Sequence, residues 1–179
     1  MTTIDLGRPV SGDVIDLILD DHRLFESLLR DLRDNSLDRD AVRQAFATLH
    51  DAHAEAEEKY VYPKLRRKDA ISEHEAEHGQ EEHAEGHEAL LAVLELKGTD
   101  TQGFDDAVEK LAAAVNHHLT EEELPILNPA REEVGPQVRA ELGERFARER
   151  NAQVDAGCGS VDNVRRIVDE ARKAGVLDD

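Results

Sequence analysis

Apolar residues recur with a period close to 3.6 along most of this chain, and the pattern predicts four amphipathic helices in its first 130 positions. These helices span about 11–34, 38–63, 72–97 and 103–124. Ser11 or Asp13 can cap the first helix, Pro63 marks the last turn of the second, and Gly98 suits a left-handed C-cap after the third. Short links between amphipathic helices predict an all-α, up-down-up-down four-helix bundle.

The character of the sequence changes after Pro129. A further helix is expected from Gly135 to about Asn151, then a loop containing Cys158, then a short helix over about 160–175. We therefore divide the chain into a bundle domain, 1–130, and a helical C-terminal extension, 131–179. The extension either packs along the bundle or forms a surface for a homo-oligomer or a protein partner. Cys158 is interpreted as a loop thiol, because no nucleophile signature surrounds it.

Composition narrows the possible partners. The 179 residues carry 41 acidic and 22 basic side chains, for a net charge of −19. This charge argues against nucleic acid and against an anionic membrane surface, since both need concentrated positive charge. A single cysteine excludes an intrachain disulfide, and no apolar run approaches the roughly 20 residues of a membrane helix. The N-terminal residues lack a signal-peptide pattern, so we expect a cytoplasmic protein.

The most informative motif occurs twice. His53 is followed four residues later by Glu57, and His118 by Glu122, and a proline comes shortly after each pair. Residues four apart lie on the same face of a helix, so each pair can close on one metal ion. Both pairs lie on apolar faces where no Lys or Arg is expected, and a buried carboxylate without a partner is costly. Metal binding explains both glutamates, whereas a metal-free bundle with titrating histidines does not.

The ligand types restrict the metal. Imidazole and carboxylate without thiolate suit iron, manganese or zinc. Two carboxylates that can bridge favour a two-metal site over a single closed zinc site. Helical bundles are known to hold two-metal carboxylate centres in this way.

Other histidines are ambiguous. His22 faces the predicted core, where a lone histidine is typically a hydrogen-bonded core residue. The third helix contains four more, of which His74 and His78 precede the apolar stripe and are expected at the surface. His83 and His87 both face inward, and His83 is favoured as the ligand, with His87 as the alternative.

Four further side chains lie close to the motif in sequence. His50 is a candidate for a supporting contact, and His117 points about 100° away from His118. Neither is expected to be a ligand. Tyr60 is in helical phase with His53, whereas Tyr62 lies next to Pro63 where the phase can fail. Either hydroxyl can donate a hydrogen bond to the site or ligate as phenolate, but a position at the edge of the bundle is favoured for both.

At this point the pattern resembles the hemerythrin-like family, the HHE cation-binding domains. The matching pieces are the stretch around Asp-His on the first helix, the two His-x-x-x-Glu motifs and Glu-His-Ala on the third helix, at 13–23, 53–63, 117–123 and 82–84. They cover roughly residues 10–130.

The resemblance implies a non-haem centre of two Fe ions with an oxo or hydroxo bridge, and it favours iron over manganese. Its terminal ligands would be histidines and its bridging ligands glutamates: His22, His53, His83 and His118, and Glu57 and Glu122. The implied function is to bind or react with a small oxidant (dioxygen, hydrogen peroxide or nitric oxide) in oxidative or nitrosative stress. Peroxide decomposition and nitric-oxide oxidation are the possible enzymatic activities. The alternative is an iron- or oxygen-sensing interaction module without turnover.

Two features depart from the family pattern. Oxygen carriers use more histidines, so the smaller set here favours oxidation or peroxide chemistry over oxygen storage. Pro125 follows Glu122 by three residues, and it is expected to kink or end the fourth helix beside the site.

Overall fold

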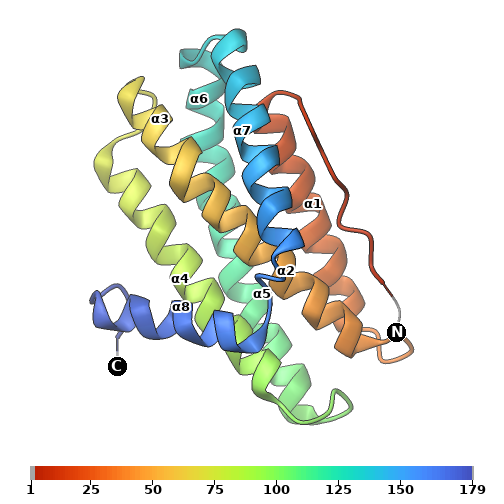
Figure 1. The fold of residues 1–179 in the computed structure, drawn as a ribbon. Coiled ribbons are helices and arrows are strands. Elements are labelled where there is room, and N and C mark those ends of the chain that lie inside the picture. Colours follow the sequence, from red (N-terminus) through yellow and green to blue (C-terminus); the bar gives the residue numbers. More distant parts are fainter. Residues whose placement is uncertain (1–2, 179) are drawn as a thin grey trace.

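Helices form all the regular secondary structure of residues 3–178, the part of the chain that the computed structural model describes (Figure 1). The long helices are α1 (Val14–Leu32), α2 (Arg39–Ala56), α4 (Glu73–Glu95), α5 (Gln102–Glu122), α7 (Pro136–Asp155) and α8 (Val161–Lys173). Shorter elements are the π-helices η1 (Glu57–Val61) and η2 (Glu123–Leu127) and the α-helices α3 (Tyr62–Arg67) and α6 (Asn128–Glu133). The predicted all-α class is confirmed.

Side-chain caps explain where the helices begin. The Oδ1 atom of Asp13, not Ser11, caps α1 by accepting the N–H of Ile15 at 3.0 Å. Ser72 starts α4 with a capping box, in which it and Glu75 each accept the other's backbone N–H. Such caps satisfy N–H groups that have no partner within the helix.

A shared core holds the helices together. Contacts join α1 to α2, α2 to α4, α4 to α5 and α1 to α5, so these four helices enclose one interior. The apolar stripes predicted from the sequence fill it, including Phe25, Phe46, Leu90 and Leu111, each at most 2% exposed. Burying each such side chain contributes about 1.5–3 kcal/mol.

The second and fourth predicted helices do not continue as simple α-helices. Each turns into a π-helix at its motif glutamate: α2 leads into η1, which begins at Glu57, and α5 leads into η2, which begins directly after Glu122. The N–H of Tyr62 donates to the carbonyl of Glu57, five residues back. Pro63 lies in the first turn of α3, so the expectation that it marks the last turn of its helix was wrong. Proline has no N–H and cannot continue an α ladder, but it is tolerated in a first turn.

Pro125 lies within η2, and the helical backbone again continues beyond it into α6. The fourth α-helix therefore ends at Glu122, as the proline predicts, although the chain stays helical. Single π turns of this kind frequently occur at functional sites.

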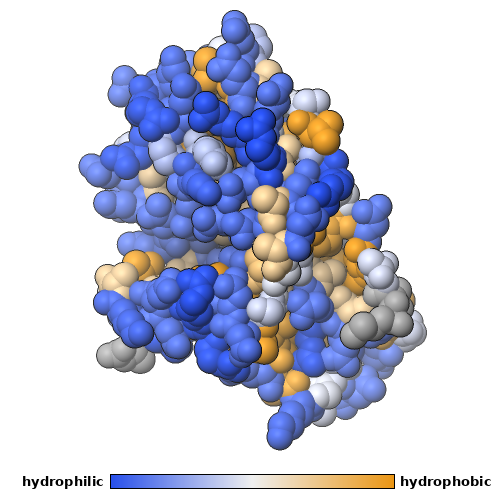
Figure 2. Space-filling view, viewed as in Figure 1, coloured by the Kyte–Doolittle hydropathy of each residue, from blue (hydrophilic) through white to orange (hydrophobic). Residues whose placement is uncertain are grey.

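The last two helices pack on the other four (Figure 1). α7 contacts α1 and α2, whereas α8 crosses α4. Val164 and Val168 of α8 are fully buried in the shared core. No helix within residues 3–178 is long and apolar enough to cross a membrane. Hydrophilic side chains cover most of the face drawn in Figure 2.

Candidate metal centre

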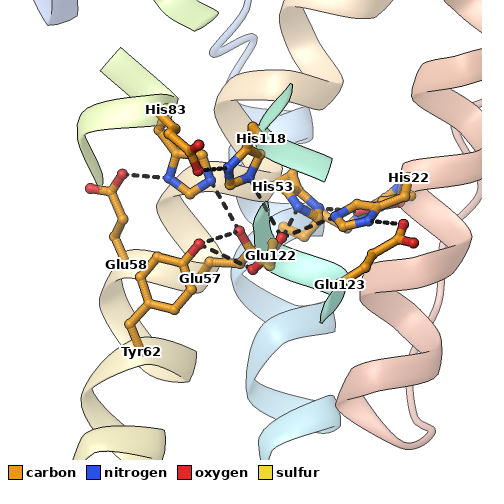
Figure 3. Close-up of polar contacts among 12 residues, drawn as sticks. His22, His53, Glu57, Glu58, Tyr62, His83, His118, Glu122 and Glu123 are labelled. Carbon is orange, nitrogen blue, oxygen red and sulfur yellow. Dashed lines mark hydrogen bonds and ion pairs between the residues drawn. The ribbon is translucent and has the colours of Figure 1, made fainter. Parts of the chain in front are cut away.

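Six side chains from five elements point toward one another in the middle of the bundle (Figure 3). They are the six predicted ligands, and none is more than 5% exposed: His22 from α1, His53 from α2, Glu57 from η1, His83 from α4, and His118 and Glu122 from α5. Glu57 is the first residue of η1 and its backbone N–H still donates to the carbonyl of His53, whereas Glu122 is the last residue of α5. The predicted i,i+4 geometry therefore holds within both motifs.

Glu57 lies between two histidines. Its Oε1 atom is 3.2 Å from Nε2 of His53, and its Oε2 atom is 3.1 Å from Nε2 of His83. The two oxygens of one carboxylate therefore face imidazoles of different helices.

Glu122 is the counterpart from the second motif. Its Oε2 atom is 3.1 Å from Nε2 of His22 and 3.5 Å from Nε2 of His118. Its Oε1 atom accepts a hydrogen bond from the Tyr62 hydroxyl at 3.0 Å.

Despite these short distances, the inward atoms have no hydrogen-bond partner. This holds for the Nε2 atoms of all four histidines and for Glu57 Oε1 and Glu122 Oε2. Leaving a buried polar atom unpaired costs about 1–3 kcal/mol, so several in one place need an explanation. Lone pairs that converge on a common point fit a cation between them.

The ligand atoms fall into two groups, each within 4.8 Å of one another. One contains His22, His53, Glu57 and Glu122, and the other contains Glu57, His83 and His118. Glu57 belongs to both groups. The donor set of imidazole and carboxylate fits a pair of metal ions such as iron, manganese or zinc.

The outward nitrogen of every histidine contacts a carboxylate (Figure 3). These Nδ1 pairs are His22–Glu123 at 2.9 Å and His83–Glu58 at 2.8 Å, both labelled in Figure 3. The other two are His53–Asp21 and His118–Glu82, each at 3.0 Å. An ionised carboxylate only accepts hydrogen bonds, so each Nδ1 donates and each Nε2 faces inward, where its lone pair can bind a metal ion in place of a proton. Carboxylate–histidine pairs of this kind orient metal ligands and raise their basicity.

Sequence reasoning did not single out these four anchoring acids, although a signal was present. Each adjoins a motif residue in the chain, in the pairs Asp21-His22, Glu57-Glu58, Glu82-His83 and Glu122-Glu123. Adjacent residues are about 100° apart on a helix, so spacing alone places these acids away from the side of the motif residues. In the structure each acid lies beside a neighbouring helix, close enough to contact the histidine of that helix.

Asp21 is held in turn by an arginine from outside the predicted bundle. Arg150 of α7 is 1% exposed, and its Nε and Nη2 atoms donate to the two oxygens of Asp21, each at 2.8 Å. The expectation that no Lys or Arg pairs with the motif glutamates concerned Glu57 and Glu122, and it does not extend to Asp21. Arg150 follows Phe146 by four residues on the buried face of α7, which is the signal that could have found it.

The electrostatics of the cluster favour positive charge. Burial opposes protonation of His22, but the carboxylates of Glu122 and Glu123 outweigh it and raise its pKa to about 10. The same balance of burial against nearby acids raises the pKa of His53 to about 9 and that of His83 to about 10. Burial likewise opposes ionisation of Glu57, yet the neighbouring histidines hold its pKa well below the usual range. A buried site that attracts cations this strongly suits metal ions.

Tyr62, not Tyr60, reaches the centre. Its hydroxyl is 3.0 Å from Glu122 Oε1 and 3.4 Å from Glu57 Oε2, and the side chain is 1% exposed. Tyr60 is partly exposed, with the Lys59 amine 5.5 Å from its ring centroid. An extra residue in the π turn changes the phase, so the residue five after Glu57 returns to its face. Burial and the two glutamates raise the pKa of Tyr62 well above its usual value, so it stays a hydrogen-bond donor.

His87 and His50 form a separate pair on the far side of His83. His87 Nδ1 donates to the backbone carbonyl of His83 at 2.8 Å, and its ring lies 4.5 Å from that of His50. Burial and the neighbouring histidines keep the pKa of His50 well below its usual range. Of the two third-helix candidates, His83 is the one that joins the cluster.

Comparison with protein families identifies the bundle. The model of the hemerythrin HHE cation binding domain matches residues 13–128, well over half of the chain. The chain belongs to this hemerythrin family. All six clustered residues lie inside the matched region, whereas α7 and α8 lie beyond it. Neither the curated proteins nor the solved structures give a match to this hemerythrin-like chain.

Proposed function

We propose that this hemerythrin-family protein is a non-haem di-iron protein that binds or reacts with a small oxidant: dioxygen, hydrogen peroxide or nitric oxide. The observation that carries the proposal is the position of Glu57, whose two oxygens face His53 and His83 and which both groups of ligand atoms share. A carboxylate placed in this way bridges two ions rather than closing around one.

Each residue has a defined role in this centre. His22, His53, His83 and His118 would bind the ions through Nε2, and Glu57 and Glu122 would bridge them. The iron pair would supply one-electron chemistry and an open coordination position for the oxidant. The four Nδ1 anchors hold the imidazoles in place, so little reorganisation is needed on binding. The Tyr62 hydroxyl keeps a proton next to both glutamates and can donate a hydrogen bond within the centre.

A cavity supports access for a small neutral ligand. It has a volume of about 570 Å³, and His83 and Glu58 form part of its wall, opposite Asn163 of α8. Asp51 and Glu55 also line it, so its field disfavours anions and admits uncharged peroxide, dioxygen or nitric oxide. Because α8 closes one side, the C-terminal extension would help to define this entrance.

The remaining expectations belong to the same proposal. The four main helices would run up-down-up-down, with residues 1–130 as the bundle domain and 131–179 as an extension that can also meet a partner or a second copy. A cytoplasmic location fits the acidic composition.

The test is metal stoichiometry in matched variants. The protein is reconstituted with ferrous iron under anaerobic conditions, desalted and assayed by elemental analysis. We expect about two irons per chain in the original protein and in Glu55→Gln, an exposed neighbour on the same helix. We expect Glu57→Gln and His53→Ala to lose the stoichiometric pair. Two irons retained in both variants, or zinc alone in the original protein, would overturn the proposal.

A sensing role without turnover is the second candidate, and one contact favours it. α8 packs on α4, the helix that carries His83, so the state of the centre can influence the extension. Limited proteolysis within 156–160 distinguishes the two functions. A sensor is expected to become cleavable there when iron is removed, whereas a catalyst is expected to keep its protection and to consume peroxide or nitric oxide over many turnovers.

A further inference from the structure

A second cluster of metal-binding side chains lies outside the centre, where α4 packs against α5. It consists of His78 and Glu82, one turn apart on α4, and His117 on α5. One ligand atom from each lies within 4.8 Å of the other two. None of these residues belongs to the six of the di-iron proposal.

Glu82 is the unusual member. It is only 4% exposed, and its Oε2 atom accepts a hydrogen bond from Nδ1 of His118 at 3.0 Å. Its Oε1 atom has no hydrogen-bond partner. A buried carboxylate oxygen without a donor is costly, so its lone pairs are available to a cation.

The two histidines face this free oxygen. Nε2 of His78 is 3.4 Å from Glu82 Oε1, and Nε2 of His117 is 3.3 Å from it. Ligand atoms about 2.0–2.2 Å from a tetrahedral ion are about 3.3–3.6 Å apart, so both distances suit a shared ion. Neither contact has the geometry of a hydrogen bond, although both are short enough for one.

We propose that His78, Glu82 and His117 bind one divalent transition-metal ion, in a site separate from the buried centre. Two imidazoles and one carboxylate suit Zn²⁺ or Fe²⁺ and leave coordination positions free for water. The side chains of His78 and His117 are 43% and 58% exposed, so solvent reaches the site directly.

The site is joined to the centre through a single carboxylate. An ion on Oε1 draws electron density from Glu82, whose other oxygen anchors His118. It therefore weakens the hydrogen bond that orients His118, and metal outside the bundle can influence the affinity of the centre inside it.

Cobalt is the probe for the test. The full chain, already loaded with iron and desalted, is titrated with Co²⁺ and followed by calorimetry and by the visible ligand-field bands of the ion. We expect one further Co²⁺ per chain. His78→Ala and His117→Ala are each expected to weaken its binding by at least about tenfold. Neither residue contacts the centre, and circular dichroism checks that each variant stays folded.

His74→Ala is the matched control. His74 lies one turn before His78, exposed on the same helix, and its ring is 6.3 Å from that of His78, but it is not part of the cluster. We expect this variant to bind Co²⁺ as the original protein does. An equal loss in His74→Ala would mean adventitious binding to a histidine-rich surface and would overturn the proposal.

The site would also be ruled out if the original protein and the His78→Ala/His117→Ala double variant took up the same amount of Co²⁺. That comparison holds whether or not the buried centre contains two irons, because the double variant keeps all six of its residues. Failure of the di-iron proposal is therefore seen in the iron content, and failure of this one in the difference in Co²⁺ uptake.

Discussion

The hydroxyl of Tyr62 occupies the space where a side chain at Gly79 would begin. A Cβ atom added to Gly79 would lie 2.8 Å from Tyr62 Oη and 2.9 Å from a ring carbon. Gly79 is on α4, four residues before His83 and therefore on the same face. Because Gly79 has no side chain, the phenol ring of Tyr62 can pack against α4 one turn before His83.

Substituting Gly79 tests this packing. Alanine in a helix interior normally gains about 1 kcal/mol over glycine, but overpacking costs about 1–3 kcal/mol. We expect Gly79→Ala to fail to stabilise the protein and to move the Tyr62 hydroxyl away from Glu122, lowering iron affinity. Urea unfolding measures the stability, and competition with a chelator measures the iron affinity. Gly103→Ala is the control, since a Cβ there meets nothing closer than 4.0 Å, and equal stabilisation of both variants would contradict the prediction.

Removing the partner of Asp21 is expected to be costly. Arg150→Met keeps most of the buried volume but leaves the carboxylate of Asp21 without its guanidinium. Breaking a buried ion pair from one side typically costs about 3–5 kcal/mol. We expect a loss of that size in the free energy of unfolding, together with weaker metal binding through His53. Exchanging Asp21 for Asn in the same variant should restore part of the stability. A loss below about 1 kcal/mol in Arg150→Met would show that the pair contributes little.

Cys158 is expected to be unreactive in the folded protein. Its thiol is 5% exposed and donates to the carbonyl of Thr48 at 3.3 Å. Burial and the charge of Asp51 raise its pKa from 9.0 to about 12. At pH 8 the thiolate fraction is then about a thousandfold smaller than in the unfolded chain, and alkylation should slow accordingly. Iodoacetamide labelling with and without urea measures the ratio, and similar rates in both conditions would refute this prediction.

The same thiol makes a pH-dependent contribution to stability. The folded state holds its proton more tightly than the unfolded state, so the contribution is fully present below about pH 9. It is lost as the pH rises from 9 toward 12. Cys158→Ser should therefore flatten the decline of the unfolding free energy in that range, as measured by urea denaturation at several pH values. An unchanged slope would contradict the assigned pKa.

Packing of α7 on the N-terminal segment gives a further prediction. A Cβ atom at Gly143 would lie 1.8 Å from the backbone carbonyl oxygen of Gly12. Backbone cannot rotate away as a flexible side chain can, so α7 would have to shift. We expect Gly143→Ala to destabilise the protein by about 1–3 kcal/mol in urea unfolding. No loss of stability would mean that α7 is less closely packed against Gly12.

Helical periodicity could be followed as far as the two motif glutamates and no further. Up to Glu57 and Glu122 the chain is regular α-helix, so the phase of His22, His53 and His118 could be predicted from spacing alone. The π turn that follows adds a residue, so spacing put Tyr60 in phase with His53 whereas the structure brings Tyr62 to the centre, although the edge of the bundle was favoured for both. Nothing in a period of 3.6 can indicate that change.

Contacts between different helices also could not be predicted from the sequence. Spacing places a residue on a face of its own helix, but it does not tell which neighbour that face meets. The contacts of Glu58 and Glu82 were therefore not predicted, although each residue anchors a histidine. Arg150 was missed for the same reason, because its partner Asp21 is 129 positions away in the chain.

The burial of the centre has a consequence for how fast metal can be exchanged. With none of the six side chains more than 5% exposed, a chelator in solution cannot contact a bound ion while the helices are closed. An ion would leave only when the bundle opens locally, and the frequency of such opening depends on local stability. The rate of iron loss should then reach a plateau as chelator concentration rises, and it should respond to mutations such as Arg150→Met that touch no ligand. The time for which the protein keeps its iron would depend on how often the helices open locally, rather than on the strength of the metal–ligand bonds.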